Sequence, residues 1–215
     1  PANFLSQYQA AVYAGADSVV SVHLSSQMSG TYESALLAAR EAAIPVSVVD
    51  SRSVGMGLGF AVLAAADAAR AGASQAEVVA AAEQVAAGAH VLFYVDTLEF
   101  LRRGGRMGVA SAAVGTALRV KPILQLLDGK VAPLEKARTA NKALARLVEL
   151  TVDMVGDRDM SVAVQHLAAA ERAEEVAAEL SVRLEIADIP LNEVGAVVGA
   201  HVGPGMVSVS MAPRP

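Results

Sequence analysis

The sequence contains no cysteine and no tryptophan, and aromatic residues make up only 4% of its 215 residues. The absence of cysteine excludes disulfide bonds and thiolate metal sites, and it is compatible with a reducing compartment. Few aromatic side chains and a net charge of −5 argue against nucleic acid as a partner, because such partners need stacking platforms and basic surfaces. Apolar residues, by contrast, make up 54% of the chain, which is enough for a sizeable core.

No cationic start followed by an apolar run appears in the first residues, so we expect no signal peptide in the given sequence. The longest uncharged stretch, Val194–Pro213, has about the length of a bilayer span, but Gly203-Pro204-Gly205 interrupts it. We therefore expect two buried strands, Glu193–Ala200 and Met206–Ala212, and no membrane helix. The chain starts at Pro1 instead of Met, and we expect a fragment that lacks an upstream segment.

Strands alternate with helices over the first part of the chain. The pattern predicts strands at Ser18–Leu24 and Pro45–Asp50 and helices at Phe4–Ala14, Thr31–Ala42, Leu58–Ala71 and, after a Ser74/Glu77 capping box, up to Ala87. Such alternation is typical of βαβ units with a parallel sheet.

After about residue 88 the pattern changes. An Asp-Gly pair, Asp128-Gly129, separates two apolar runs and predicts a β-hairpin. The other predicted elements are strands at Val91–Val95, Ser161–His166 and Leu184–Pro190 and helices at Leu98–Arg103, Ser111–Leu118, Thr139–Val155 and Ala170–Arg183. We predict an α/β protein with two domains, residues 1–88 with a parallel sheet and residues 89–215 with a mostly antiparallel sheet.

The polar segment SSQMSGTY, residues 25–32, joins the first predicted strand to a helix. The first amides of a helix lack partners and carry the positive end of its dipole, so this elbow can bind an anion. Ser29, Gly30 and Thr31 lie at the junction. An alternative is that Ser29 only caps its helix, and the spacing leaves both interpretations open.

Two further polar positions stand out in the second half. Arg106 lies in the glycine-rich loop Gly104–Gly108 and could pair with a carboxylate or phosphate, although an arginine in a loop is often only solvated. His201 lies in the apolar segment GAHVGPG, where a histidine is most often a hydrogen-bonded core residue.

The sequence matches the patterns of dinucleotide, metal and hydrolase sites poorly. GMGLGF at Gly55–Phe60 has Phe at the third glycine position of the dinucleotide fingerprint and no acidic strand end follows, so we reject a dinucleotide site. The four histidines are far apart and predict no metal site. A Ser/His/Asp hydrolase or acyltransferase using Ser29, His201 and Asp50 or Asp96 stays open as a rival, although Ser29 is not in G-x-S-x-G.

Five motifs in order, SSQMSGTYESA, VVDSRSVGMG, DTLEFLRRGGRMG, KPIL…DG…PLEKART and GAHVGPGM, resemble the motif series of the DegV family of bacterial fatty-acid-binding proteins. The resemblance spans Pro1 to about Ala212. It implies a Rossmann-like N-terminal domain, a C-terminal lipid-binding domain, and a long-chain fatty acid held between them. It also implies a cytoplasmic protein that performs no chemistry and presents the fatty acid to a fatty acid kinase.

Carried over by motif, Ser29 would bind the carboxylate, Gly30 and Thr31 would supply backbone donors, and Arg106 and His201 would complete the polar network. Ser26 in the same elbow is included as a ligand contact. The resemblance implies no cofactor and no metal, and it allows transient membrane contact for lipid exchange. The family normally begins with a strand, a T-D-S-T-like motif and a T-S-Q-P-like segment, and the chain starts just after the point where these are expected.

Overall fold

The computed structural model describes residues 1–107 and 120–214. They form two compact units, Pro1–Gly88 and Ala89–Arg214. Both units combine helices with a sheet, so the predicted α/β class is confirmed. The predicted helix Ser111–Leu118 and the last residue of the glycine loop, Gly108, lie outside the described residues.

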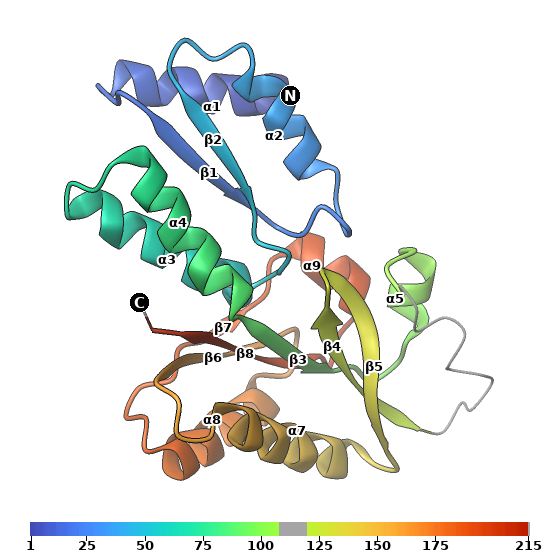
Figure 1. The fold of residues 1–215 in the computed structure, drawn as a ribbon. Coiled ribbons are helices and arrows are strands. Elements are labelled where there is room, and N and C mark those ends of the chain that lie inside the picture. Colours follow the sequence, from blue (N-terminus) through green and yellow to red (C-terminus); the bar gives the residue numbers. More distant parts are fainter. Residues whose placement is uncertain (108–119, 215) are drawn as a thin grey trace. The chain divides into compact units, whose positions relative to one another are not determined.

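The first unit is built on two parallel strands. Strand β1 (Val19–His23) pairs with β2 (Val46–Asp50), and His23 lies opposite Asp50 (Figure 1). The four helices of this unit are α1 (Ala2–Tyr13), α2 (Thr31–Ala39), α3 (Met56–Arg70) and α4 (Gln75–Ala87). The predicted alternation of helix and strand is therefore confirmed for this unit.

Alternation along β1 gives the two faces of this sheet different partners. Val20 and Val22 point to one face, where they pack with Val49 and the apolar sides of α3 and α4. Ser21 and His23 point to the other face and interact with side chains of α1. The capping box at the start of α4 is confirmed, since Ser74 N–H donates to Glu77 Oε2 at 2.7 Å and Glu77 N–H donates to Ser74 Oγ.

The second unit contains a six-stranded sheet in the order β5-β4-β3-β8-β6-β7. Its strands are β3 (His90–Tyr94), β4 (Lys121–Leu127), β5 (Lys130–Ala137), β6 (Met160–His166), β7 (Leu191–Glu193) and β8 (Val207–Pro213). Every neighbouring pair is antiparallel except β6 and β7, which are parallel. The prediction of a mostly antiparallel sheet is confirmed.

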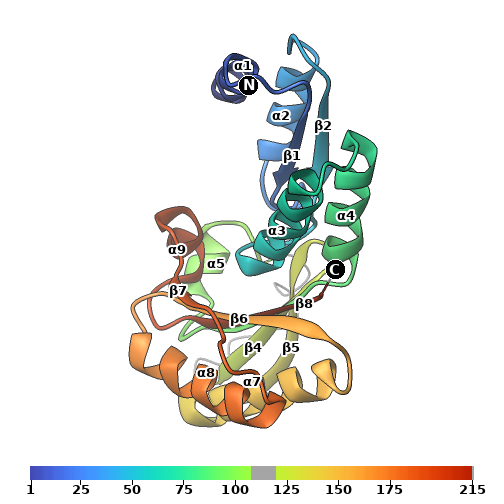
Figure 2. The same ribbon diagram turned by 90° about the vertical axis from the view of Figure 1, so that its left-hand side faces the viewer.

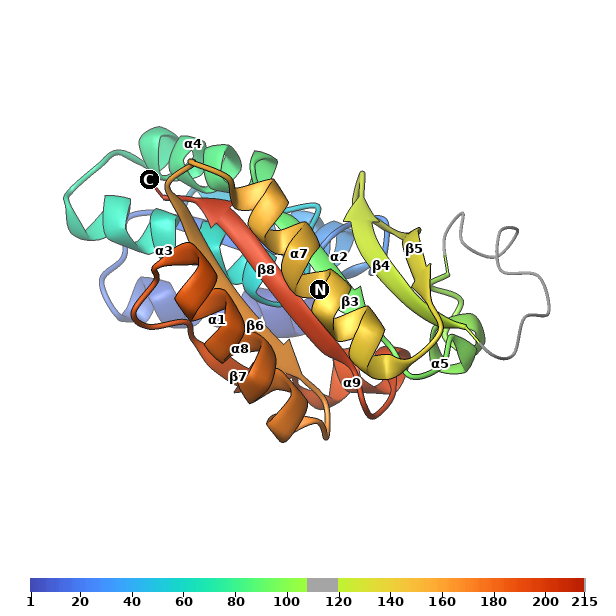
Figure 3. The same ribbon diagram turned by 90° about the horizontal axis from the view of Figure 1, so that it is seen from below.

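The long helices α7 (Ala140–Val155) and α8 (Ala170–Leu184) lie side by side across one face of this sheet (Figures 2 and 3). Leu147, Val148 and Leu180 are almost fully buried there and form one core with the inward side chains of β3, β6 and β8. The hairpin between β4 and β5 turns at Asp128 and Gly129, whose φ angles are 51° and 76°. Two positive φ angles in succession are what a type I′ turn requires, so the Asp-Gly prediction is confirmed.

Two predicted strands near the C-terminus are wrong. The predicted strand Glu193–Ala200 is absent beyond its first residue, because Ala196–Val202 is a helix, α9. Gly199 lets this helix pack closely on Leu167, since an added Cβ would lie 3.1 Å from Leu167 Cδ2. The predicted strand Leu184–Pro190 is also absent, because Glu185 takes a left-handed conformation that ends α8, and the strand forms later, at Leu191–Glu193.

Candidate ligand-binding site

The polar elbow of the first unit lies where β1 ends. Residues at the carboxyl ends of parallel strands meet at one edge of the sheet. Here two backbone amides of the β1 elbow donate hydrogen bonds to the end of β2 and to the elbow after it. Ser25 N–H donates to the Ser53 carbonyl at 2.9 Å, and Ser26 N–H donates to Asp50 Oδ1 at 3.2 Å. The elbow is thus held by the neighbouring strand and is not a free loop.

Ser29 lies one residue before Gly30, the N-cap of α2, and binds the helix start through its side chain, while its contact with a ligand stays a prediction. Its Oγ accepts a hydrogen bond from the Thr31 amide at 3.3 Å, so it satisfies one helix-start donor. As a hydroxyl it keeps a proton of its own to donate. The Thr31 amide, predicted to face the ligand, is therefore already engaged by Ser29.

The start of α2 keeps other donors available. Ser34 is the first residue of this helix whose amide finds a backbone acceptor, the carbonyl of Gly30. The hydroxyl of Thr31 is shielded from solvent and, within residues 1–107 and 120–214, has no hydrogen-bond partner. A buried hydroxyl without a partner is costly and is often explained by a bound group. Gly30 is exposed, and an added Cβ there would meet nothing within 4 Å.

A second buried hydroxyl, that of Ser53, lies in the elbow after β2. It is also shielded and lacks a partner among the residues that the structure describes. The sequence predicted no ligand contact in this elbow, because a serine in a turn is common and does not by itself indicate a binding site.

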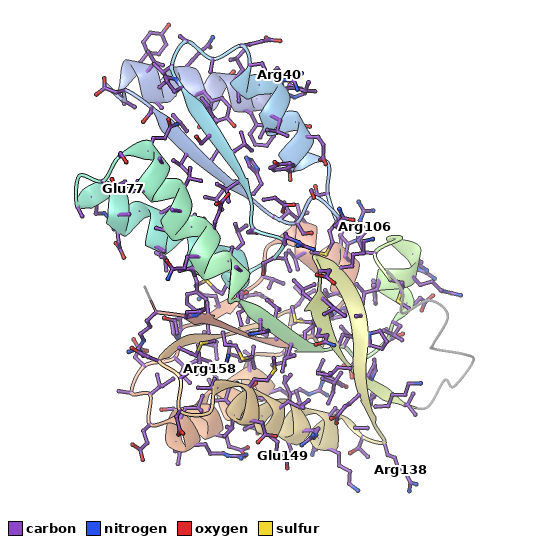
Figure 4. All side chains as sticks on the ribbon, viewed as in Figure 1. Arg40, Glu77, Arg106, Arg138, Glu149 and Arg158 are labelled. Carbon is purple, nitrogen blue, oxygen red and sulfur yellow. The ribbon has the colours of Figure 1, made fainter. Side chains whose placement is uncertain are left out.

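In the second unit the predicted Arg106 and His201 share one neighbour, Gly104. Arg106 is exposed and follows α5 (Glu99–Arg103) (Figure 4). Its Nη1 donates to the Gly104 carbonyl at 2.6 Å. His201 lies on helix α9, and the expectation that it lies on a strand is wrong. An ideal Cβ on Gly104 would overlap Nδ1 of His201 and lie 3.0 Å from its Cε1.

A matching close contact lies at the end of α9. A Cβ on Gly203 would lie 2.6 Å from Cε2 of Phe100, so the ring of Phe100 rests directly on the glycine backbone. Gly104 and Gly203 thus allow α5 and α9 to approach each other closely. Sequence analysis noted these glycines but could not find their contacts, because the two segments are far apart in the chain.

Three side chains form hydrogen bonds with the Asp96 carboxylate, and the sequence did not predict this network. Asp96 Oδ1 accepts hydrogen bonds from the Tyr94 hydroxyl at 2.5 Å and from Lys121 Nζ at 2.9 Å, and Oδ2 accepts one from Arg172 at 3.2 Å. Partial burial raises the pKa of Asp96, but these hydrogen bonds outweigh it and hold the pKa below its usual value. Burial and the bond to Asp96 raise the pKa of Tyr94.

The Asp96 network borders a cavity of about 550 Å³. Its walls are formed by Asp96, Ala168, Ala169, Ala170, Glu171, Arg172, Pro204 and Gly205. Gly205 is needed here, because its φ of 87° favours glycine and an added Cβ would lie 2.9 Å from Asp96 Cγ.

The described residues contain no cluster of histidine, aspartate and glutamate that could hold a metal ion. Within the same residues no helix is long and apolar enough to cross a membrane. Ser26, Ser29, Gly30 and Thr31 belong to the first unit, and Arg106 and His201 belong to the second. That these six residues bind one ligand stays a prediction.

Comparison with known proteins decides the family. The family model described as "Uncharacterised protein, DegV family" matches residues 1–214. The chain belongs to the DegV family. The resemblance found in the five sequence motifs is thereby confirmed.

Relatives of the DegV family cover nearly the whole chain. A DegV domain-containing protein of Streptomyces coelicolor is 51% identical over 215 residues, which are 100% of this chain and 76% of the relative. A solved structure described as fatty acid binding of a DegV family protein from Thermus thermophilus is 34% identical, with a TM-score of 0.87 and coverage of 100% of this chain and 77% of that one. DegV of Bacillus subtilis, described as a fatty acid binding protein, is 32% identical, with a TM-score of 0.86 and coverage of 99% and 76%.

Proposed function

We propose that this protein binds a long-chain fatty acid and holds its carboxylate at the elbow Ser25–Thr31. The observation that carries the proposal is the start of α2. The buried hydroxyl of Thr31 has no partner among the described residues, and Ser34 is the first residue of the helix whose amide donates to a backbone carbonyl. Its support from outside the chain is that DegV relatives at 34% and 32% identity are described as binding fatty acids.

The chemistry of the elbow suits a carboxylate. A carboxylate taken out of water needs several donors, because an unpaired buried charge would take up a proton instead. Helix-start amides and the hydroxyls of Ser29 and Thr31 are such donors, and the helix dipole adds a favourable field. Burial of the acyl chain contributes about 0.8 kcal/mol for each CH₂, which offsets the cost of ordering the ligand. Arg106 and His201 are proposed as the further polar contacts.

Mass spectrometry of the purified protein under native and denaturing conditions tests the proposal. We expect a fatty acid bound in the native spectrum and released on denaturation. Titration with palmitate gives the affinity directly. A protein that binds no fatty acid, and in which Ser29 is labelled by a fluorophosphonate, would contradict the proposal and favour the rival hydrolase or acyltransferase using Ser29 and His201.

The bound fatty acid is further proposed to be presented to a fatty acid kinase, with transient membrane contact for lipid exchange. The sequence has no P-loop pattern G-x-x-x-x-G-K-[ST], so ATP would be supplied by the partner enzyme. Arg106 is exposed on its loop and is the residue proposed to serve the kinase as well as the ligand.

Arg106→Ala is expected to reduce kinase-dependent acyl-phosphate formation more than it reduces palmitate binding. Arg103→Ala, which removes an exposed arginine paired with Glu99 in the adjacent helix, is the control and should change neither quantity. Acyl-phosphate formation from ATP by the purified protein alone would contradict the non-enzymatic proposal. Equal losses in both quantities would leave Arg106 as a ligand contact only.

A further inference from the structure

The two ring nitrogens of His201 have different surroundings. Nδ1 is shielded from solvent and has no hydrogen-bond partner in the part of the chain that the structure describes. That side of the ring faces the backbone of Gly104, where even a methyl group would overlap Nδ1. No ligand atom can therefore reach Nδ1 while the ring stays in this position. His201 is only half-buried as a residue, and Nε2 is not among the buried atoms that lack a partner, so Nε2 is the nitrogen left to contact a ligand.

The backbone of Gly104 shows why a glycine is needed at this position. Its φ and ψ angles are −73° and −9°, which are ordinary right-handed helical values that any residue adopts. Conformation alone therefore does not require glycine here. The requirement comes from the imidazole ring, which occupies the place of a side chain.

Contacts on both sides keep this arrangement in place. The Gly104 amide donates to the Phe100 carbonyl at 2.9 Å, and the Gly104 carbonyl accepts the Arg106 guanidinium. The ring of Phe100 in turn packs on Gly203, the residue that ends α9. The helix that carries His201 is therefore held against the residue that closes off Nδ1.

We propose that Gly104 is a positioning residue that seals Nδ1 of His201, so that the neutral ring carries its proton on Nε2 and donates it to the ligand carboxylate. The position that a Cβ of Gly104 would take is occupied by a Cα hydrogen that points at Nδ1. A lone pair on Nδ1 can face this hydrogen, whereas a proton on Nδ1 would collide with it and find no acceptor. A proton on Nε2 can reach an acceptor. The inference rests on the proposed function for the identity of the ligand. The placement of the proton follows from the surroundings of the ring alone.

The first test compares two glycine substitutions by palmitate titration. Gly104→Ala forces the ring of His201 to move, and we expect the affinity to fall about tenfold, the size of one lost hydrogen bond. Gly195→Ala is the matched control, because Gly195 lies at the start of the same helix with a φ of −66° and an added Cβ there meets nothing within 4 Å. The control should bind palmitate like the wild type.

A double-mutant cycle separates positioning from general damage. If Gly104 acts through the ring, Gly104→Ala should cause no further loss of affinity in a His201→Ala background. A Cβ on Gly104 would also lie 3.2 Å from the Phe100 carbonyl oxygen, and a loss caused by that contact would persist in the double variant. Such persistence would overturn the proposal, as would unchanged palmitate binding by Gly104→Ala.

Two amide substitutions test which nitrogen is used. Glutamine places its side-chain NH₂ near the position of Nε2, and asparagine places it near Nδ1. His201→Gln should therefore retain most of the palmitate affinity, whereas His201→Asn should lose as much as His201→Ala. Equal losses for His201→Gln and His201→Asn would contradict donation from Nε2.

Nitrogen-15 NMR of the ligand-free protein tests the proton position independently of binding. The ring signals of His201 are assigned by their loss in His201→Gln, and we expect the pattern of a proton on Nε2. A proton on Nδ1 would overturn the inference even if palmitate binds. Absence of palmitate binding by the wild type would contradict the proposed function, while the NMR result would still decide the state of the ring.

Discussion

At the scale of single residues, substitution of Ser29 distinguishes a ligand-binding elbow from one that only begins a helix. Its Oγ already accepts the Thr31 amide at 3.3 Å, which is a long hydrogen bond. A serine that only capped the helix would contribute to stability and not to ligand affinity. These two effects can be measured separately.

Ser29→Ala is expected to lower palmitate affinity roughly ten- to a hundredfold, because a hydrogen bond to a charged group contributes about 1.5–3 kcal/mol. The free energy of unfolding should fall by no more than about 1 kcal/mol, since only a weak cap is lost. Ser34→Ala, in the same helix, serves as the control and should retain the affinity. Unchanged palmitate binding by Ser29→Ala would show that Ser29 is only a cap.

Asp96 forms ion pairs with two cationic side chains of the second unit, Lys121 and Arg172. Asp96→Asn removes the charge that pairs with Lys121 and Arg172, and we expect the free energy of unfolding to fall by about 1–2 kcal/mol. The expected loss is smaller than for a fully buried ion pair, because the Asp96 side chain is 35% exposed and water screens the charges. Chemical denaturation measures this change. Asp67→Asn is the control, since Asp67 pairs with Arg70 on the surface and should cost less than about 0.5 kcal/mol.

At the scale of elements, helix α1 is attached to β1 by a partly buried chain of polar side chains. The Tyr8 hydroxyl donates to Ser21 Oγ at 3.0 Å, and Ser21 Oγ lies 2.8 Å from His23 Nε2. The ring of Phe4 meets His23 edge-on at a centroid distance of 5.1 Å. These contacts fix α1 on the face of the sheet that carries Ser21 and His23.

Tyr8→Phe removes one hydroxyl from this chain and is expected to lower the free energy of unfolding by about 1 kcal/mol. Tyr13→Phe is the matched control in the same helix. Tyr13 is 91% exposed, so removal of its hydroxyl should change the free energy of unfolding very little. Equal denaturation curves for Tyr8→Phe and Tyr13→Phe would show that the hydroxyl of Tyr8 does not stabilise the attachment of α1.

At the scale of the whole molecule, two histidines link stability to pH. Burial lowers the pKa of His23, against the opposing charge of Asp50, and burial together with the charge of Arg158 lowers the pKa of His90. The unfolded chain therefore binds protons at a higher pH than the folded protein does. The stability that these residues contribute is present above their unfolded pKa of about 6.5 and is lost as the pH falls through the lower folded values.

We therefore expect the free energy of unfolding to decrease between about pH 7.5 and about pH 5.5, measured by urea denaturation at a series of pH values. The double variant His23→Gln and His90→Gln should show a flatter dependence over this interval, even if it is less stable throughout. An equally steep loss in the double variant would assign the pH dependence to other groups.

The sequence by itself determined the features that depend on neighbouring residues. The capping box of Ser74 and Glu77, the Asp-Gly hairpin and the alternation of strands and helices in the first unit are all local patterns, and they formed as predicted. The motif series was also sufficient for the family. The helix start after Ser29 could likewise be predicted, because capping and dipole effects act within one turn.

Only the tertiary structure decided what depends on contacts between distant segments. Residues 193–200 have a valine-rich pattern typical of a strand, yet Ala196–Val202 forms α9, in which Gly199 packs closely against Leu167. Asp96 and Arg172 are 76 positions apart, and no local pattern pairs them. The contact of Gly104 with His201 was likewise hidden, because a glycine carries no side chain to signal its partner. Packing overrides local propensity at such places, since its free energy depends on the shape of the neighbouring segment and not on the sequence nearby.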